Sequence, residues 1–227
     1  MKSELKYTPQ NLDEVIYPSL AVERRVKAYA TGMLEGHVFL YGPNGTGKST
    51  IARLLVDAIG SGCGQIDTFS NEELVEKNDL REYLLRCGAM AKLTVAGKHF
   101  LVLDEFDYVR KGTDKLWRAL DACSDGVMAI ITTNNPNDIK PAIRSRFDLI
   151  EMPAISAQAA LPRVQFILRA EGIVLPDLQV YSYLQKKETL MDWRKYLKAA
   201  DELVFLRNSG LPFPSWTRPQ SHKLKLV

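Results

Sequence analysis

The fold is indicated first by the stretch Gly42-Pro43-Asn44-Gly45-Thr46-Gly47-Lys48-Ser49-Thr50. This stretch follows the apolar run 37–41, which predicts a buried strand, and precedes apolar residues at helical spacing that end before Gly60. Strand, glycine-rich turn and helix, in this order, are the setting in which the pattern GxxxxGK[ST] predicts a phosphate-binding loop. The alternative is a loop that only joins a strand to a helix, and the flanking elements argue against it.

The residue types of this loop suit a chain of phosphates. Glycines allow backbone conformations that bring successive N–H groups around a phosphate, and the helix N-terminus adds a partial positive charge. We expect Lys48 to reach the β- and γ-phosphates and Ser49 to offer its hydroxyl to Mg²⁺. The sequence therefore predicts a nucleoside triphosphate site, whose other loop members are Gly42, Asn44, Gly45, Thr46, Gly47 and Thr50.

Two acids follow a second apolar run, residues 100–103. Ligands of open α/β sheets bind at the carboxyl ends of the strands, so Asp104 is expected to hold Mg²⁺, directly or through water. Glu105 is expected to orient and deprotonate the attacking water. The alternative is a strand end with solvated acids. The position of this run after the phosphate loop, within a βαβ pattern, favours the magnesium site.

A third apolar run, residues 127–133, predicts another buried strand and ends at Asn134. An amide beside the two acids would be suited to hold the attacking water. Asn135-Pro136 follows, however, and the local sequence taken alone favours an ordinary Asn-Pro turn.

Composition limits the remaining possibilities. The chain has 227 residues, a net charge of +3 and a hydrophobic fraction of 46%, which are the values of a soluble globular protein. This net charge is too small to argue for nucleic acid, so any basic surface must be local. No apolar run has the length of a membrane span, and the polar N-terminus is no signal peptide, so no membrane partner is expected. Cys63, Cys87 and Cys123 fit free thiols in a reducing cytoplasm, and their spacing predicts no zinc site.

The order of the predicted elements gives the fold class. We expect an α/β domain with a five-stranded parallel sheet over residues 1–153, with strands near 37–41, 65–69, 100–103, 127–133 and 149–152. A first helix is expected from Ala21 to about Leu34. A small all-helical domain is expected over residues 154–207, in which Pro162 must start or kink a helix, followed by an irregular tail, 208–227.

Taken together, these motifs resemble those of the AAA+ ATPases, and within them the small subunits of DNA-polymerase clamp loaders, especially those of tailed phages. The resemblance covers roughly residues 5–205. Its three more selective parts are Tyr7-Thr8-Pro9 with Leu12-Asp13-Glu14-Val15, Asp104-Glu105-Phe106-Asp107, and Thr133-Asn134-Asn135-Pro136 followed by Arg144-Ser145-Arg146. The helical domain that follows contains Asp192-Trp193-Arg194-Lys195.

The resemblance implies further site residues. Asn134 is implied as the sensor-1 residue that positions water, and Arg146 as the arginine finger that reaches the γ-phosphate held by a neighbouring subunit. Arg194 is implied as sensor 2, which contacts the γ-phosphate in its own subunit. For both arginines the alternative is a surface residue. The resemblance also implies an adenine pocket lined by Tyr7, Pro9, Val15 and Ile16.

The chain departs from the family pattern at several points. Thr8 stands where such subunits commonly have arginine, and Phe147 where they often have cysteine. The cysteine-rich zinc insertion of bacterial loader subunits is missing. A third, all-helical collar domain is also expected in the family, whereas this sequence stops just after the helical domain 154–207, which corresponds to the lid of the family. Assembly would then rely on the ATPase faces and another protein, or the chain belongs to a different AAA+ branch.

Contact with DNA is implied for basic residues on helices that would line a central channel. Acids interleave with several of them, and a solvated helix face looks the same. The residues are Lys77, Arg81, Arg110, Lys111 and Lys115.

The resulting expectation is an oligomer of identical or different AAA+ subunits that hydrolyses ATP with Mg²⁺ at subunit interfaces. Its work would be to place a ring-shaped sliding clamp, or another replication ring, on DNA in the cytoplasm, or in the host cytoplasm for a viral protein. One alternative is a helicase loader or another remodeller of protein complexes. A second is a module that binds the nucleotide only to organise an assembly.

Overall fold

The computed structural model describes residues 6–61, 66–68, 79–106, 113–123, 125–135, 137, 141–187 and 192–214. The chain divides into two compact units. The α/β unit is Pro9–Pro153, and the helical unit joins the residues before Pro9 to the chain from Ala154 on. Across the described ranges, no helix is both long and apolar enough to cross a membrane.

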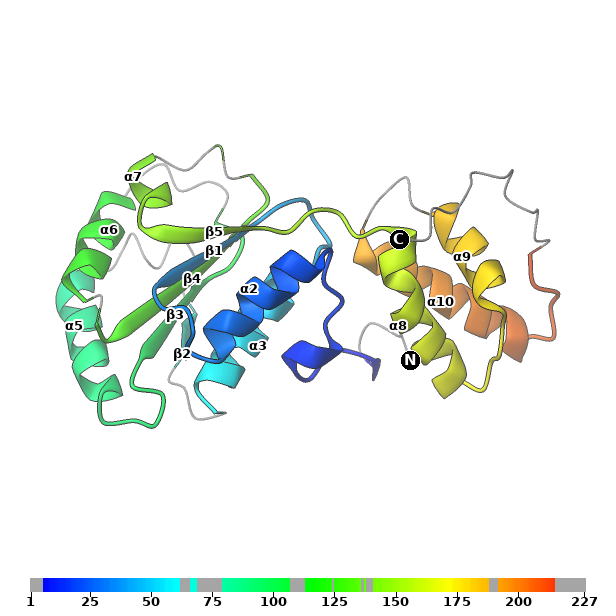
Figure 1. Ribbon diagram of the computed structural model, residues 1–227, viewed down its shortest axis with the longest axis horizontal. Helices are drawn as coiled ribbons and strands as arrows, with labels where there is room; N and C mark the ends of the chain where they lie inside the picture. The colour runs from blue at the N-terminus through cyan, green and yellow to red at the C-terminus, as the bar shows by residue number, and fades with distance from the viewer. Residues whose placement is uncertain are drawn as a thin grey trace. The chain divides into compact units, whose positions relative to one another are not determined.

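A parallel sheet forms the centre of the α/β unit, with strand order β2-β3-β4-β1-β5 (Figure 1). Every residue of β3 and β4 is buried, as expected for strands covered on both faces. The edge strand β2 contributes only three residues. The strands are β1 His37–Tyr41, β2 Ile66–Thr68, β3 His99–Leu103, β4 Val127–Thr133 and β5 Phe147–Glu151.

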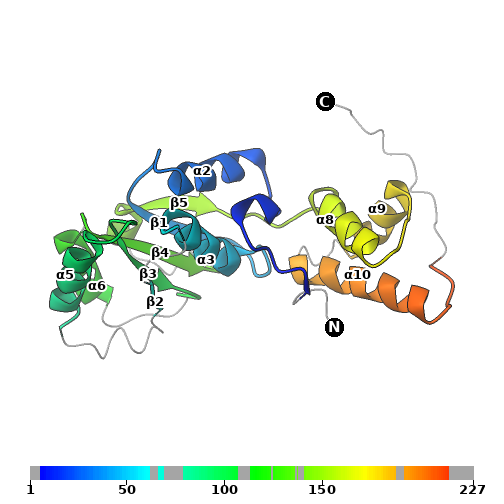
Figure 2. The same cartoon turned by 90° about the horizontal axis from the view of Figure 1, so that it is seen from below.

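Helices cover both faces of this sheet. On one face, α2 (Leu20–Ala30) and α3 (Lys48–Ile59) enclose an apolar cluster that includes Val26, Ile51 and Ile130. On the other, α5 (Leu80–Ala91) and α6 (Thr113–Ala122) enclose a cluster that includes Leu84, Leu116 and Phe39. Figures 1 and 2 show the three layers. The predicted α/β class is confirmed, because the apolar runs form inner strands and the amphipathic segments form the outer layers.

The register of the sheet sets the place of the site. Parallel pairing aligns Leu103 with Ile131 and Tyr41 with Thr133, so the residues that follow β3, β1 and β4 meet at one edge. Three backbone bonds continue past the strands: Phe106 N to Thr132 O (2.8 Å), Gly42 N to Thr133 O (3.3 Å) and Met152 N to Tyr41 O (2.7 Å).

Two predicted boundaries, the end of the first helix and the start of the last strand, differ from the structure. Helix α2 ends at Ala30 rather than near Leu34, because Thr31 closes it and Gly32 adopts φ +74°. Strand β5 begins at Phe147 rather than 149, since the Phe147 ring is buried against Phe39 at 6.0 Å between ring centroids. The short helix α7, Pro141–Arg144, precedes it.

The helical unit contains α8 (Ala157–Ala170), α9 (Asp177–Gln185) and α10 (Trp193–Asn208). Pro162 does not start α8: Ser156 caps that helix by accepting the Ala159 N–H, and Pro162 lies inside it. Tyr196 of α10 is fully buried and donates a hydrogen bond to Ile155 O at 3.0 Å, which ties α10 to the chain entering α8.

Candidate nucleotide site

The phosphate loop joins β1 to α3 and depends on glycine at two positions. Gly42 has φ +144°, and a Cβ placed there would lie 2.1 Å from Met152 O. Gly47 has φ +85° and caps α3, whose first helical hydrogen bond runs from Ile51 N to Gly47 O at 2.9 Å. The first turn of a helix directs its N–H groups outward, so this geometry offers donors to an anion.

Lys48 is the first residue of α3, directly after the glycines of the loop, and is 7% exposed. Its Nζ donates to Gly42 O at 2.9 Å and to Pro43 O at 2.7 Å. The Thr46 hydroxyl, which is also buried, donates to Pro43 O at 3.1 Å. Neutral carbonyls hold an ammonium less strongly than an anion does. The loop therefore keeps a partly desolvated positive charge where a phosphate would be bound more tightly.

Asp104 connects the loop to the acidic strand end. Its Oδ1 atom accepts hydrogen bonds from the Ser49 hydroxyl at 2.7 Å and from the Thr132 hydroxyl. Hydroxyl and carboxylate oxygens are ligands that Mg²⁺ prefers, and Mg²⁺ usually keeps several waters. The donor set brought together here fits that ion, with Ser49 and Asp104 as the residues that would hold it.

Glu105 adopts φ +53°, a conformation that is uncommon for residues other than glycine. Its N–H donates to Thr132 Oγ1 at 3.0 Å, and the following residue, Phe106, is buried against Trp117. The backbone of Glu105 is thus held on both sides in a strained conformation. Such strain persists where the surrounding structure determines it, and it is frequent at functional sites.

Asn134 directly follows β4 and is half-buried. It stands two residues after Thr132, at the same edge of the sheet as Asp104. The Asn135 N–H donates to Thr133 Oγ1 at 3.2 Å, which fixes the turn that begins here. The turn and the proposed water-holding role are therefore compatible with each other.

Arg146 lies between α7 and β5 and binds Asp121 of α6. Its Nε donates to Asp121 Oδ1 at 2.6 Å, and a terminal nitrogen donates to Oδ2 at 2.9 Å. These hydrogen bonds hold the pKa of Asp121 below its usual range. The guanidinium remains partly exposed, with 34% of the side chain accessible.

The residues implied for an adenine pocket lie in different units. Val15 packs on the core beneath α3, and Arg53 of α3 donates to Pro9 O at 3.4 Å. Ile16 is half-buried and follows the short 3₁₀ helix η1, Leu12–Glu14. Tyr7 belongs to the helical unit. The pocket itself stays a prediction.

Tyr7 is held by α8 and the turn after it. Its hydroxyl donates to Glu171 at 2.6 Å, and Arg163 donates to Tyr7 O at 2.9 Å. Burial and the hydrogen bond to Glu171 raise the pKa of Tyr7.

Arg194 also belongs to the helical unit, in the first turn of α10. It is exposed, and its N–H donates to Asp192 Oδ1 at 2.8 Å. Its role as sensor 2 stays a prediction.

Of the residues implied in DNA contact, Arg81 on α5 and Lys115 on α6 are exposed on helices that pack side by side (Figure 1). Lys77, Arg110 and Lys111 lie outside the described residues.

Two residues of the site were not identified from the sequence. Thr132 bridges Asp104 and the Glu105 N–H, and the visible sign was a pair of hydroxyl residues ending an otherwise apolar strand. Asp121, the partner of Arg146, carries no such sign, because it is one of two acids in an amphipathic helix.

Comparison with known proteins adds a family and a set of relatives. The model of the family described as "ATPase family associated with various cellular activities (AAA)" matches residues 38–153. This match runs from β1 through β5 and includes the phosphate loop, Asp104, Glu105, Asn134 and Arg146.

Curated relatives include replication factor C subunits and phage sliding-clamp-loader subunits. The replication factor C small subunit 2 of Pyrobaculum arsenaticum is 26% identical over 175 residues, covering 76% of this chain and 54% of the relative. The sliding-clamp-loader large subunit of Enterobacteria phage T4 is 29% identical over 214 residues, covering 87% of this chain and 63% of the relative. The chain thus spans about half to two thirds of the length of these relatives.

Solved structures with the same fold include the RuvB Holliday junction branch migration motor of Thermotoga maritima. It superposes with a TM-score of 0.69 at 18% identity, covering 90% of this chain and 68% of RuvB. At this identity the likeness establishes the fold alone.

Proposed function

The chain belongs to the AAA family of ATPases, as its motifs predicted, and from this we propose that it binds ATP with Mg²⁺ and hydrolyses it. One observation carries the proposal: the Ser49 hydroxyl and the Asp104 carboxylate, 55 residues apart in the chain, meet at 2.7 Å. This contact supports a site in which the phosphate loop and the acidic strand end act on one ligand.

The residues of the phosphate loop and of the adjoining strand ends each have a proposed role. Lys48 exchanges its bonds to two loop carbonyls for stronger ones to phosphate oxygens. Glu105 accepts a proton from the attacking water, and Asn134 holds that water. Thr132 positions both acids. Bound Mg²⁺ would neutralise charge developing on the phosphates.

We assign Arg146 to a site completed by a neighbouring subunit. A planar guanidinium suits the charge spread over a transferring phosphoryl group, and donation in trans would couple hydrolysis to assembly. Arg194 is proposed to contact the γ-phosphate within its own chain. The working form would then be an oligomer of identical or related subunits.

The work done by hydrolysis is proposed to be the loading of a sliding clamp onto DNA. This proposal is supported by the names of the relatives, a replication factor C subunit and a sliding-clamp-loader subunit. Arg81 and Lys115 are the described residues proposed to track the DNA backbone.

Hydrolysis is tested by Glu105→Gln, with Glu151→Gln as its matched control. Glu151 is exposed and ends β5 at the same edge of the sheet. We expect Glu105→Gln to lower kcat by about a hundredfold or more with ATP affinity retained, since only proton acceptance is removed. Glu151→Gln is expected to match the wild type. Equal activity of Glu105→Gln and wild type would favour a module that binds nucleotide without hydrolysing it.

The shared site is tested by mixing two inactive variants, Lys48→Ala and Arg146→Ala. If one subunit supplies the loop and the next the guanidinium, some interfaces in the mixture are intact and activity returns. Full activity of Arg146→Ala by itself would rule the shared site out.

A pull-down then identifies the partner on which the ATPase acts. Capture of a ring-shaped clamp supports clamp loading, and capture of a hexameric helicase supports the helicase-loader alternative.

A further inference from the structure

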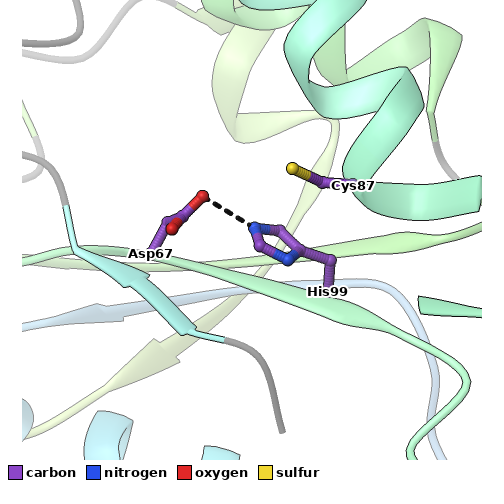
Figure 3. Close-up of side chains that lie close together, drawn as sticks. All are labelled: Asp67, Cys87 and His99. Atoms are coloured by element: carbon purple, nitrogen blue, oxygen red, sulfur yellow. Dashed lines mark hydrogen bonds and ion pairs between the residues drawn. The ribbon is translucent and has the colours of Figure 1, made fainter. Parts of the chain in front are cut away.

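Three side chains of types that commonly bind metals lie close together at the edge of the sheet, on the side covered by α5 (Figure 3). Asp67 comes from β2, Cys87 from α5 and His99 from the first position of β3. One ligand atom from each lies within 4.8 Å of the others. His99 Nε2 and Asp67 Oδ2 are 2.9 Å apart, and the Cys87 sulfur points toward this pair.

The register of the strands explains why these residues converge. Asp67 pairs with Leu101, and alternate residues of a strand share a face, so Asp67 and His99 project to the same side of the sheet. Helix α5 packs on that side. Tyr83 and Cys87 are four residues apart on α5 and therefore lie on one helix face. Spacing along the chain gave no indication of this cluster, because each ligand comes from a different element.

The chemistry of the three side chains fits zinc. A thiolate, an imidazole and a carboxylate are all zinc ligands, and a soft thiolate disfavours Mg²⁺ and Ca²⁺. One thiolate and one carboxylate neutralise a divalent ion, which matters because only 3% of the His99 surface is exposed. The Tyr83 hydroxyl donates a hydrogen bond to Asp67 Oδ2. Carboxylates that bind metals are commonly oriented by hydrogen bonds of this kind from neighbouring side chains.

We propose that Asp67, Cys87 and His99 form a zinc-binding site, with water in the fourth position. On binding, the Cys87 thiol releases its proton to solvent, and His99 binds zinc through Nε2 with its ring proton on the buried Nδ1. The zinc ion takes the place of the hydrogen bond between His99 and Asp67. Zinc bond lengths place ligand atoms about 3.5 Å apart. The three ligand atoms lie within 4.8 Å of one another, and the His99–Asp67 pair at 2.9 Å would open slightly to admit the ion.

The role of the site is structural. His99 begins β3, whereas Asp104 and Glu105 follow the other end of that strand. Zinc would join the three-residue edge strand β2 and helix α5 to β3. The proposal is independent of ATP hydrolysis, and its test does not need an active enzyme.

The test measures zinc binding by the full chain against a chromogenic chelator of micromolar affinity, and then melting with and without zinc. We expect equimolar zinc to be retained, and a rise in Tm of about 5–10 °C at a hundredfold excess over Kd. Cys87→Ala is expected to lose both effects. Asp67→Asn, which keeps an acceptor for Tyr83, is expected to bind at least tenfold more weakly.

Two control variants separate this site from other thiols. Cys123→Ser and Cys63→Ser are expected to bind zinc as the wild type does. With Co²⁺ in place of zinc, the wild type is expected to show a thiolate-to-cobalt charge-transfer band that Cys87→Ala lacks. Zinc lost to the chelator by the wild-type chain, or binding and a Tm shift that persist in Cys87→Ala, would overturn the proposal.

Discussion

Arg146 and Asp121, 25 residues apart in the chain, form a paired ion contact in which Nε and a terminal nitrogen each donate to a different carboxylate oxygen. This is the bidentate geometry in which arginine also binds phosphate. The same two nitrogens of Arg146 cannot bind the Asp121 carboxylate and a phosphate at once. Asp121 therefore competes with any phosphate that Arg146 is to contact.

We expect Asp121→Asn to raise ATPase activity at limiting protein concentration by up to about fivefold. The pair is partly exposed, and solvent screening makes such ion pairs weak, which bounds the gain. Specific activity measured over a range of protein concentrations checks this. Asp57→Asn is the control, because Asp57 is similarly exposed and pairs with Arg53 on α3. A fall in activity would instead mean that Asp121 holds Arg146 in its working orientation.

Thr132 is expected to act on catalysis through Asp104 and Glu105. Thr132→Val removes the hydroxyl that bonds Asp104 and accepts the Glu105 N–H. We expect kcat to fall by tenfold to a hundredfold, and stability by about 1–3 kcal/mol, because an N–H is left without its acceptor and both acids lose a fixed position. ATP affinity measured without Mg²⁺ should stay close to that of the wild type.

Thr132→Ser tests whether the hydroxyl is the cause. It keeps the oxygen and removes only a methyl group, so kcat is expected to return to near the wild-type value. Equal losses in Thr132→Ser and Thr132→Val would assign the effect to packing within β4.

Much of the fold was readable from local sequence because its decisive features are local. The run at 127–133 is apolar throughout most of its length, and the loop at 42–50 combines glycines with Lys48 and Ser49. These patterns fix element type and order. They also place the ends of β1, β3 and β4 together, since parallel strands share one carboxyl edge.

The remaining features depend on contacts between distant residues. The pairing of Arg146 with Asp121, and of Asp67 with His99, follows from helix orientation and strand register, which no single segment encodes. The first residue of β5 differs from the prediction for the same reason, because burial of Phe147 against Phe39 extends the strand. Tertiary packing decided these points over local propensity.

Gly42 and Gly47 are expected to tolerate alanine very differently. Gly42→Ala would place a Cβ 2.1 Å from Met152 O, so the end of β5 must move, and we expect a loss of about 3 kcal/mol or more. At Gly47 nothing lies within 4 Å of the added Cβ, and only the positive φ costs energy, about 1–2 kcal/mol. Urea unfolding of both variants without nucleotide checks the order. Equal losses would contradict it.

His37 is expected to make stability depend on pH. His37 is the first residue of β1. Nδ1 of its ring accepts the Ala129 N–H at 3.1 Å, which requires the neutral form of the imidazole. Burial lowers the pKa of His37, Lys98 adds to this effect, and Asp121 opposes it. The unfolded imidazole takes up a proton near pH 6.5, before the folded one does. Stability is therefore full above pH 6.5 and declines as pH falls toward the lower folded pKa, by at most about 1.4 kcal/mol per pH unit.

The matched variant is His37→Asn, whose side-chain oxygen can accept the Ala129 N–H and does not titrate. Urea unfolding in steps from pH 7.5 to 5.5 should give a shallower decline for His37→Asn than for the wild type. Asp121→Asn removes the charge that favours the protonated ring, so it should lower the folded pKa of His37 and extend the decline to lower pH. Equal slopes in His37→Asn and wild type would show that other groups carry the pH dependence.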